Sequence, residues 1–299
     1  MVSPLHEGGM LQVRMPSPSS LTRESGRFCA SQARTFDYDR YVCALAAKPG
    51  YLRPLMALLA FNVEIARTRE LVHEPTLGEI RLQWWREGLA EAFSGRPRSH
   101  PVLEEVADLA AGLSQPLMQA LVDGRARDLA DEPFADLAAL EGYLASTAGR
   151  LAEALARACG AMRAATFQAA QAVGFAWGMV GIVRAVPFHA SVGRVLLPAD
   201  MLAANGVAEA SLRAGTPQAG LASVLEGLTA RASGRLTQAR ALRREIEIDA
   251  LPALLPAGLA DLYVRRLEKS RFRIFESPIA LGPLVAPASV MWNAVRKRY

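Results

Sequence analysis

The spacing of the apolar residues is the feature that most limits what this chain can fold into. From about residue 35 to residue 268 they recur three or four positions apart, which places them on one face of an α-helix. No segment alternates β-branched or aromatic residues with polar ones in the manner of a half-buried strand. The sequence therefore predicts an all-α fold.

Length and composition indicate a globular protein of one large domain or two ordinary ones. The chain has 299 residues, and 51% of them are hydrophobic, which is ample for a sizeable core. No stretch of about 18 or more purely apolar residues occurs, so we predict no transmembrane helix. We expect residues 1–30 to be a flexible basic extension without a secretory signal, either transit-like or simply disordered. The resemblance described below implies that residues 31–299 form one helical domain.

The net charge and the cysteines indicate which kinds of molecule the protein can bind and whether its cellular compartment is reducing. The formal net charge of +5 comes mainly from arginine, which suits phosphate groups, acidic lipids or nucleic acid. No zinc pattern, recognition helix or aromatic-rich basic strand is found, so we predict no binding to nucleic acid. Three cysteines without paired spacing indicate a reducing compartment and no structural metal.

One predicted helix, from about Met162 to Val186, has a face almost without side chains. Three glycines and an alanine follow one another at i, i+4, i+7 and i+11 and share a narrow stripe: Gly174, Gly178, Gly181 and Ala185. Glycine inside a helix costs roughly 1 kcal/mol relative to alanine, so the stripe needs a reason. It indicates either very close packing or the loss of functional side chains. Pro187 is expected to end this helix.

A second helical stripe places a carboxylate on a core-facing line. Buried carboxylates are rare unless they are paired or bound to a metal, so Asp128 suits either a structural salt bridge or a pocket. Asp123 and Arg127, four residues apart, are expected to form a surface ion pair. Of two adjacent tryptophans, Trp84 lies on the core stripe of its helix, and Trp85 is expected to point towards a neighbouring helix or a pocket.

The chemistry has to be sought in a long pattern, because the sequence contains no GxSxG, P-loop, GxGxxG or HExxH motif. Three stretches together resemble the squalene/phytoene synthases. The first is a proline-broken helical pair that ends in Ala60-Phe61-Asn62, and the second, residues 85–102, is similar to the family's W-R-x-x-L, G-x-P and H-P-V signature. The third joins residues 181–184 to residues 193–200. The resemblance covers roughly residues 36–276 and implies the isoprenoid synthase fold, with helices around a central cavity.

The resemblance also implies a reaction and a metal. Squalene/phytoene synthases join two prenyl diphosphates head to head, with magnesium held by two aspartate-rich motifs. Carried onto this sequence, the first motif falls on Ala66, Arg67 and Glu70, which keeps one carboxylate. A further segment, Leu121 to Leu129, puts Asp128 at a pocket-facing family position.

The second aspartate-rich motif is lost more completely. It falls on Ala185 and on Phe188-His189, which carry no carboxylate. Polar residues on the same face of that helix are replaced by Gly178 and Gly181. The resemblance thus implies that most of the magnesium ligands are missing.

One branch of the family, the assembly factors of respiratory complex I, is more similar than the rest. In the assembly factors, Phe-Asn-Val-Glu replaces the cysteine-arginine stretch that precedes the first motif in the rest of the family, and this chain has the same four residues at 61–64. The assembly factors also have a proline and a histidine after a shortened second motif, as in Pro187-Phe188-His189 of this chain. This resemblance implies an accessory protein at an energy-transducing membrane. Such a protein would act by contact with a partner or by holding a lipid-like molecule.

We therefore expect a non-catalytic accessory or assembly factor with a respiratory-chain protein as partner and no cofactor. Two alternatives stay open: a magnesium-dependent prenyltransferase that uses Glu70, Asp128 and a basic pocket, and a carrier of a prenyl diphosphate or an isoprenoid lipid. The expected location is the bacterial cytoplasm or a mitochondrial matrix-like compartment, peripheral at the inner membrane. The candidate pocket-lining residues are Asn62, Glu70, Trp85, Asp128, Tyr143, Gly178, Gly181, Arg184, Ala185 and His189.

The carboxyl-terminal end suggests peripheral contact with a membrane. Its aromatic and aliphatic residues are interleaved with basic ones: Phe272, Ile274, Phe275, Ile279 and Trp292 with Arg271, Arg273, Arg296, Lys297 and Arg298. This composition suits an anionic bilayer surface. The alternative is a core-packed last helix with a solvated basic end.

Overall fold

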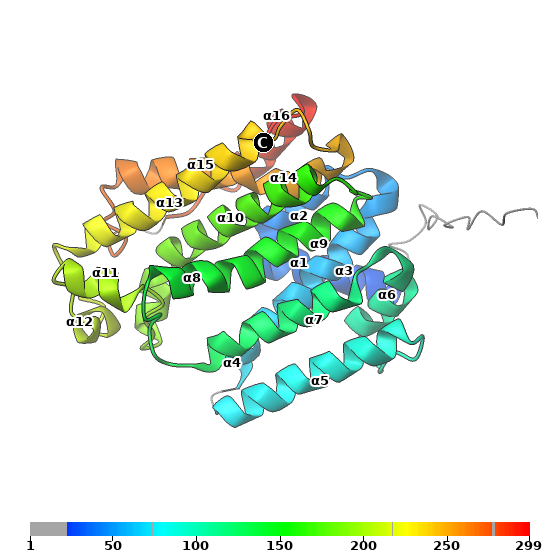
Figure 1. The fold of residues 1–299 in the computed structure, drawn as a ribbon, viewed down its shortest axis with the longest axis horizontal. Coiled ribbons are helices and arrows are strands. Elements are labelled where there is room, and N and C mark those ends of the chain that lie inside the picture. Colours follow the sequence, from blue (N-terminus) through cyan, green and yellow to red (C-terminus); the bar gives the residue numbers. More distant parts are fainter. Residues whose placement is uncertain (1–22, 73, 217, 277–278) are drawn as a thin grey trace, which may run out of the picture.

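The computed structural model describes residues 23–72, 74–216, 218–276 and 279–299, and within these ranges it contains no β-strand (Figure 1). The predicted all-α fold is confirmed. The first half of the chain forms α1 Glu24–Phe36, α2 Tyr38–Ala44, α3 Pro49–Ala66, α4 Thr68–Leu71, α5 Pro75–Phe93, α6 Pro101–Leu109, α7 Gln115–Gly124, α8 Leu137–Leu144 and α9 Arg150–Ala158. The second half forms α10 Ala164–Ser191, α11 Ala199–Ala204, α12 Glu209–Arg213, α13 Leu221–Ala241, α14 Leu251–Leu254, α15 Pro256–Lys269 and α16 Val285–Val295.

Short helical turns of other types join several of these elements. They are the 3-10 turns η2 Ala110–Gly112, η3 Arg125–Leu129 and η5 Ile248–Ala250, and the π-helical turn η4 Ala145–Gly149. Because η4 follows α8 and precedes α9 directly, residues 137–158 form one continuous helical rod. Helix α1 begins at Glu24, before the domain boundary expected at residue 31. The expectation for residues 1–22 lies outside the described part of the chain.

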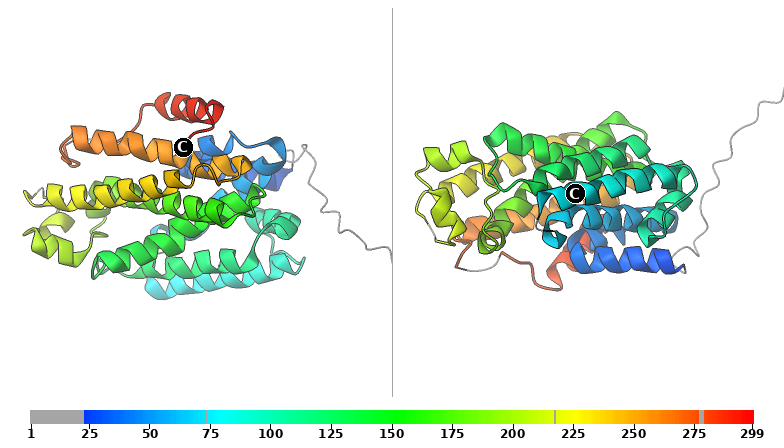
Figure 2. Two further views of the ribbon diagram at one scale, coloured as in Figure 1. Left: turned by 45° about the horizontal axis from the view of Figure 1, so that its top comes forward. Right: turned by 90° about the horizontal axis from the view of Figure 1, so that it is seen from below.

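Helix α10 is the central element of the bundle. It packs along α13 on one side and along α9 and η4 on another, and it also contacts α15 (Figures 1 and 2). In the described ranges it is the one helix that is long and apolar enough to cross a membrane, but 61% of its most apolar window is buried inside the protein. Its apolar composition is therefore that of a core helix.

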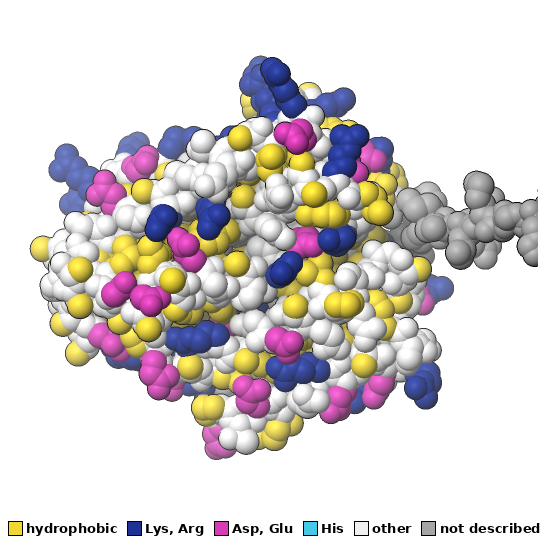
Figure 3. Space-filling view, in the orientation of Figure 1, with side chains coloured by type: hydrophobic (Ala, Val, Ile, Leu, Met, Phe, Trp, Pro, Cys, Tyr) yellow, Lys and Arg dark blue, Asp and Glu magenta, His cyan; other side chains and the backbone are white. Residues whose placement is uncertain are grey.

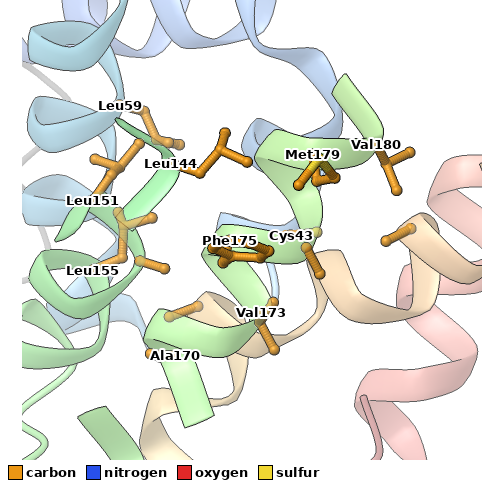
Figure 4. Close-up of a cluster of buried hydrophobic side chains, with 14 of the residues drawn as sticks. Cys43, Leu59, Leu144, Leu151, Leu155, Ala170, Val173, Phe175, Met179 and Val180 are labelled. Carbon is orange, nitrogen blue, oxygen red and sulfur yellow. The ribbon is translucent and has the colours of Figure 1, made fainter. Parts of the chain in front are cut away.

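The core forms where α10 meets the rod of residues 137–158. Figure 4 shows Leu144, Leu151 and Leu155 of the rod on one side of α10, with Leu59 from α3 beside them. Ala170, Val173, Phe175, Met179 and Val180 project from α10, Val173 and Val180 away from the rod, and Cys43 from α2 lies near Phe175. All of these side chains belong to one buried apolar cluster. Aliphatic side chains at helical spacing thus pack the helices together, as the sequence pattern predicts.

The expectation that Pro187 ends α10 is wrong, because the helix continues through it to Ser191. The helix ends at a glycine instead. Gly193 has φ +68°, its N–H donates to the Ala190 carbonyl at 2.9 Å, and the next N–H, of Arg194, donates to the His189 carbonyl at 2.8 Å. This pair of bonds is a Schellman motif, which satisfies the last carbonyls of the helix and turns the chain towards α11.

Candidate functional site

A cavity of about 750 Å³ lies beside the carboxyl-terminal half of α10. Its other walls come from α4, η3, α8 and η4 and from the segment between α10 and α12, elements that lie towards the left of Figure 1. One part of the lining is apolar and includes Leu144, Ala148, Trp177, Ile182, Phe188 and Leu196. Another part is basic and consists of Arg40, Arg69, Arg125, Arg194 and Arg213. The cavity therefore offers both an apolar wall and a cluster of guanidinium groups.

The structure brings six of the ten candidate residues together on the cavity wall. These are Glu70, Asp128, Tyr143, Gly178, Gly181 and His189. Asn62 is buried and joins the wall indirectly, because its Oδ1 accepts a hydrogen bond from Arg125 Nη2 at 3.0 Å. Trp85, Arg184 and Ala185 do not line the cavity.

Trp85 lies in the core against a neighbouring helix, the first of the two positions expected for it, and does not line the cavity. Its side chain is fully buried, and its ring packs edge-on against Phe61 of α3, with centroids 5.7 Å apart, and against His100, at 5.0 Å. Trp84, expected on the core stripe, is only partly buried. Trp85, and not Trp84, is therefore the more deeply buried of the two. The reason is that Phe61 of α3 and His100 at the start of α6 cover the side of α5 from which Trp85 projects.

Arg184 projects away from the cavity towards α15. Its guanidinium carbon lies 3.3 Å from the centroid of the Tyr263 ring, and its Nε donates to the Ile279 carbonyl at 3.1 Å. Tyr263 in turn donates its hydroxyl proton to Asp39 at 2.7 Å. Burial lowers the pKa of Arg184, but the guanidinium stays charged at neutral pH. Arg184 thus links α10 to α15 and to the segment between α15 and α16.

Asp128 combines the two roles left open by its sequence position. It lines the cavity, and its carboxylate is also held by Arg125 at 3.2 Å and by the Tyr143 hydroxyl at 2.6 Å. Burial and the charge of Asp128 raise the pKa of Tyr143 well above its ordinary value, so the hydroxyl keeps its proton and donates it. Since Arg125 also bonds Asn62, one guanidinium joins α3, η3 and α8.

Other acidic side chains near the cavity also form ion pairs with arginines. Glu70 forms an ion pair with Arg67 at 3.2 Å. Asp123 does not pair with Arg127 as expected, and instead its carboxylate bonds Arg86 at 2.6 Å. Arg127 donates to the carbonyl oxygens of residues 132 and 133. The spacing of four residues fails here because helix α7 ends at Gly124 and the backbone changes to the 3-10 turn η3.

The glycine stripe of α10 has two causes rather than one. At Gly174 a methyl group would lie 2.3 Å from the Ala148 carbonyl oxygen, and at Gly178 it would lie 2.8 Å from Leu144 and 2.9 Å from Ala148. These two glycines let α10 approach the rod of residues 137–158 closely. At Gly181 a methyl group would meet nothing within 4 Å, and this glycine lines the cavity. Close packing therefore accounts for the first part of the stripe and open space for the last.

Arg194 is the cavity arginine without an acidic partner among the described residues. Arg40, Arg69, Arg125 and Arg213 form ion pairs with Asp37, Asp131, Asp128 and Glu209. Arg194 Nη2 instead donates to the carbonyl oxygens of Asp128, at 2.8 Å, and Ala130, at 3.3 Å. Its neighbour His189 is neutral, because burial and Arg194 lower the histidine pKa to about 4. The wall and its partners thus carry an excess of one positive charge, located at Arg194.

The sequence alone did not single out Arg125 or Arg194 as cavity residues. Arg125 precedes Asp128 by three residues, a spacing that brings two side chains together on a helical turn, so the pair was detectable. Arg194 follows the glycine that ends α10 and lies in the third family-like stretch. The direction of the Arg194 side chain into the cavity depends on the Schellman turn at Gly193. The sequence alone did not predict this turn, because Pro187 is expected to end the helix.

The residues of this cavity do not fit a magnesium–diphosphate cluster. Magnesium takes hard oxygen ligands, mainly carboxylates in a protein site. In the described part of the chain no group of three or more Asp, Glu, His or Cys side chains is arranged to hold a metal. The three acids of the cavity wall, Glu70, Asp128 and Asp131, are each bound to an arginine. An arginine next to a would-be ligand opposes a divalent cation by like-charge repulsion.

Comparison with known sequences gives a consistent picture. Residues 33–285 match the family model described as squalene/phytoene synthase. The chain is 28% identical to the mouse protein NADH dehydrogenase (ubiquinone) complex I, assembly factor 6, over 96% of this chain and 90% of that protein. The human protein of the same name is 26% identical, with the same coverage. A phytoene synthase from Rhodobacter capsulatus is 27% identical over 77% of this chain and 69% of that enzyme.

Solved structures support the architecture. A dehydrosqualene synthase in complex with ligand superposes with a TM-score of 0.81 over 94% of this chain and 98% of that one, at 16% identity. Squalene synthase HpnC from Alicyclobacillus acidocaldarius gives a TM-score of 0.73 over 83% and 94%, at 15% identity. At these identities the likeness establishes the fold alone. It is the isoprenoid synthase arrangement of helices expected from the sequence.

Proposed function

The chain belongs to the squalene/phytoene synthase family, and we propose that it is a non-catalytic member that serves as an accessory or assembly factor for respiratory complex I. The cavity wall carries the proposal. Where the family resemblance puts metal-binding side chains, this chain has Ala66, Arg67, Gly178, Gly181 and Ala185. Diphosphate is a poor leaving group without a cation to neutralise it, so such a wall does not favour ionisation of a prenyl diphosphate.

Similarity to the complex I assembly factors supports the second half of the proposal. It extends over nearly the full length of both proteins, whereas the phytoene synthase from Rhodobacter capsulatus is matched over a smaller share. The proposed partner is a respiratory-chain protein. The proposed location is the bacterial cytoplasm or a matrix-like compartment, at the surface of the energy-transducing membrane.

The catalytic half is tested by incubating the purified full chain with farnesyl or geranylgeranyl diphosphate and magnesium. We expect no release of diphosphate, while the Rhodobacter capsulatus phytoene synthase serves as the positive control. The matched variant is Glu70→Gln, which removes the one carboxylate left in the first motif. Release that the variant abolishes would show that the chain is an enzyme and would refute the proposal.

The assembly half is tested in the host cell by deleting the gene and measuring the amount of assembled complex I in native gels. We expect less assembled complex, restored by the wild-type chain and by Glu70→Gln alike. A normal amount of complex I in the deletion strain would refute the assembly role. Restoration by wild type but not by Glu70→Gln would show that the carboxylate matters and would contradict a non-catalytic role.

The cavity itself favours a second candidate function, the holding of a lipid. A volume of about 750 Å³ is within the range of ordinary ligand sites, and the wall combines apolar side chains with Arg194. An excess of one positive charge matches a single anionic group better than a diphosphate, which carries several negative charges. The ligand class we propose is therefore a single apolar chain, isoprenoid or similar, with one anionic head group.

Organic extraction of the purified chain followed by mass spectrometry tests this candidate. We expect a lipid at close to one mole per mole of wild-type protein. Gly181→Trp, which fills open space, should abolish it, and Arg194→Gln should reduce it. Ile80→Ser, an exposed change on α5, is the control and should retain the lipid. Protein that is folded and free of lipid would refute the candidate.

A further inference from the structure

The last helix, α16, carries an apolar stripe on its outer surface. Leu284, Met291 and Val295 expose 79%, 67% and 77% of their surface, and Trp292 exposes 59%. Ala288 is also exposed. Leu284, Ala288, Met291 and Val295 therefore follow the helical spacing i, i+4, i+7 and i+11, and Trp292 lies beside Met291. We call these five residues the α16 stripe. A contiguous exposed apolar surface of this kind marks an interaction site more often than isolated exposed residues do.

The opposite side of α16 is fixed to the protein, so the stripe is held outward. Ala286 and Val290 are buried against the core. Gly258 of α15 lets the helices approach, because a methyl group there would lie 2.5 Å from the Asn293 amide nitrogen. The chain end is fastened to α13, since the buried Tyr299 donates its hydroxyl proton to the Ala239 carbonyl at 2.8 Å. The exposed and buried faces of α16 therefore cannot exchange without breaking these contacts.

A basic cluster adjoins the stripe. Arg296, Lys297 and Arg298 follow the helix directly, and all three are exposed. Residues 279–299 contain no Asp or Glu side chain. Arg243 at the end of α13 extends the cluster, because its guanidinium donates to the Lys297 carbonyl at 3.3 Å. In Figure 3, Lys and Arg side chains gather at the top of the molecule, where Figure 1 draws α16.

Lys297 adds an independent observation. Its φ is +51°, the left-handed region in which glycine is favoured, and it occupies the position that ends α16. A lysine there is conformationally less favourable than glycine. Residue 297 therefore carries a charged side chain at a position where glycine would be less strained. Trp292 is stacked under Arg296, whose guanidinium carbon lies 3.9 Å from the ring centroid, so an aromatic ring and a cation are presented together.

From these observations we propose that α16 docks the protein on an anionic lipid bilayer. The stripe would enter the boundary between head groups and acyl chains, with Trp292 at the interface, where tryptophan is favoured. The basic cluster would contact anionic head groups. Charge complementarity singles out this occupant, because the exposed apolar surface adjoins cations and residues 279–299 carry no acidic side chain, which suits acidic lipids. Asp261, an acid next to the chain end, is paired with Arg240. This proposal goes beyond the assembly role and does not depend on the cavity.

The test is flotation of the full chain with vesicles of phosphatidylglycerol and phosphatidylcholine, compared with vesicles of phosphatidylcholine alone. We expect binding to the anionic vesicles that weakens with added salt. Met291→Ser combined with Trp292→Ser and Val295→Ser should reduce the partition coefficient roughly tenfold or more, since exposed apolar area is removed. Lys297→Gly combined with Arg298→Gln should reduce it by about fivefold for each charge lost. Glycine at residue 297 suits its backbone, so the second variant is expected to fold.

The matched control is Leu77→Ser combined with Ile80→Ser, which removes two exposed apolar side chains from α5. We expect this control to bind like the wild type. Equal binding by the wild type and the α16 variants would overturn the proposal, and so would equal binding to neutral vesicles. A wild-type protein that ignores lipid but self-associates in sedimentation, with the association lost in the stripe variant, would make α16 a protein contact and would also overturn it.

Discussion

Alanine at Gly174 should destabilise the protein, whereas alanine at Gly181 should stabilise it. Both glycines lie on the same face of α10, seven residues apart in the helix. The new methyl group at Gly174 would lie 2.3 Å from the Ala148 carbonyl oxygen and 2.7 Å from the Ala152 Cβ, and the nearest obstacle is backbone that cannot rotate away. At Gly181 it would enter open space. The same glycine-to-alanine change therefore measures overpacking at residue 174 and helix propensity alone at residue 181.

The expected magnitudes follow from two opposing terms. Replacing glycine by alanine inside a helix gains roughly 1 kcal/mol, because alanine loses less backbone entropy on folding. Overpacking a tight contact costs about 1 to 3 kcal/mol, with backbone clashes at the upper end. We therefore expect Gly181→Ala to raise the free energy of unfolding by about 1 kcal/mol. Gly174→Ala should lower it by about 2 kcal/mol.

Urea denaturation followed by far-UV circular dichroism measures both changes under identical conditions. Gly178→Ala provides an intermediate case, because its methyl group would meet the movable end of Leu144 at 2.8 Å as well as the Ala148 Cβ. Its midpoint should fall between those of the other two variants. Equal shifts for Gly174→Ala and Gly181→Ala would show that the close approach of α10 to the rod of residues 137–158 does not determine stability, and would refute the reasoning.

Three further outcomes are expected. Glu105→Gln should lower the free energy of unfolding by about 3 kcal/mol in urea, because it breaks a buried ion pair with Arg53 at 2.6 Å; Glu276→Gln, in an exposed pair, is the control and should change it by less than about 0.5 kcal/mol. Burial lowers the pKa of His189 to about 4 from its ordinary 6.5, so its contribution to stability is complete above pH 6.5 and is lost as the pH falls towards 4. His189→Gln should therefore lose less stability than wild type over that pH range, and parallel loss in both proteins would contradict the assignment. Burial also raises the thiol pKa of all three cysteines, so none should react with a thiol reagent until denaturant is added, and rapid labelling of the native protein would contradict their burial.

The helices were predictable because their signal is local. The period of the apolar residues depends only on which neighbours in the sequence share a face. The end of α10 was missed for a local reason of another kind. Pro187 is a strong stop signal, yet the chain stays helical through it, and the helix ends at the Schellman turn of Gly193, six residues further on.

The cavity was predictable only in part, because its network joins residues distant in the sequence. Asn62 and Arg125 are 63 residues apart, and Arg125 and Tyr143 are 18 apart. Which of two adjacent tryptophans is buried depends on which helix covers the face, and periodicity cannot supply that. The glycine stripe shows the same limit. Its spacing is evident in the sequence, but the distances that distinguish Gly174 from Gly181 exist only in the folded chain.

The guanidinium of Arg125, which joins Asn62, Asp128 and Tyr143, also restricts the routes by which this chain could acquire metal-dependent chemistry. Putting carboxylates at residues 178, 181 and 185 would not be enough, because Asp128 is already engaged and Arg125 would compete with any cation. Removing Arg125 first would leave three acceptors, Asn62, Asp128 and Tyr143, without this donor and would cost stability. Neither change alone would therefore give a metal site. A metal site would need both changes in the same chain, so the Arg125 network separates this chain from metal-dependent chemistry by more than one substitution.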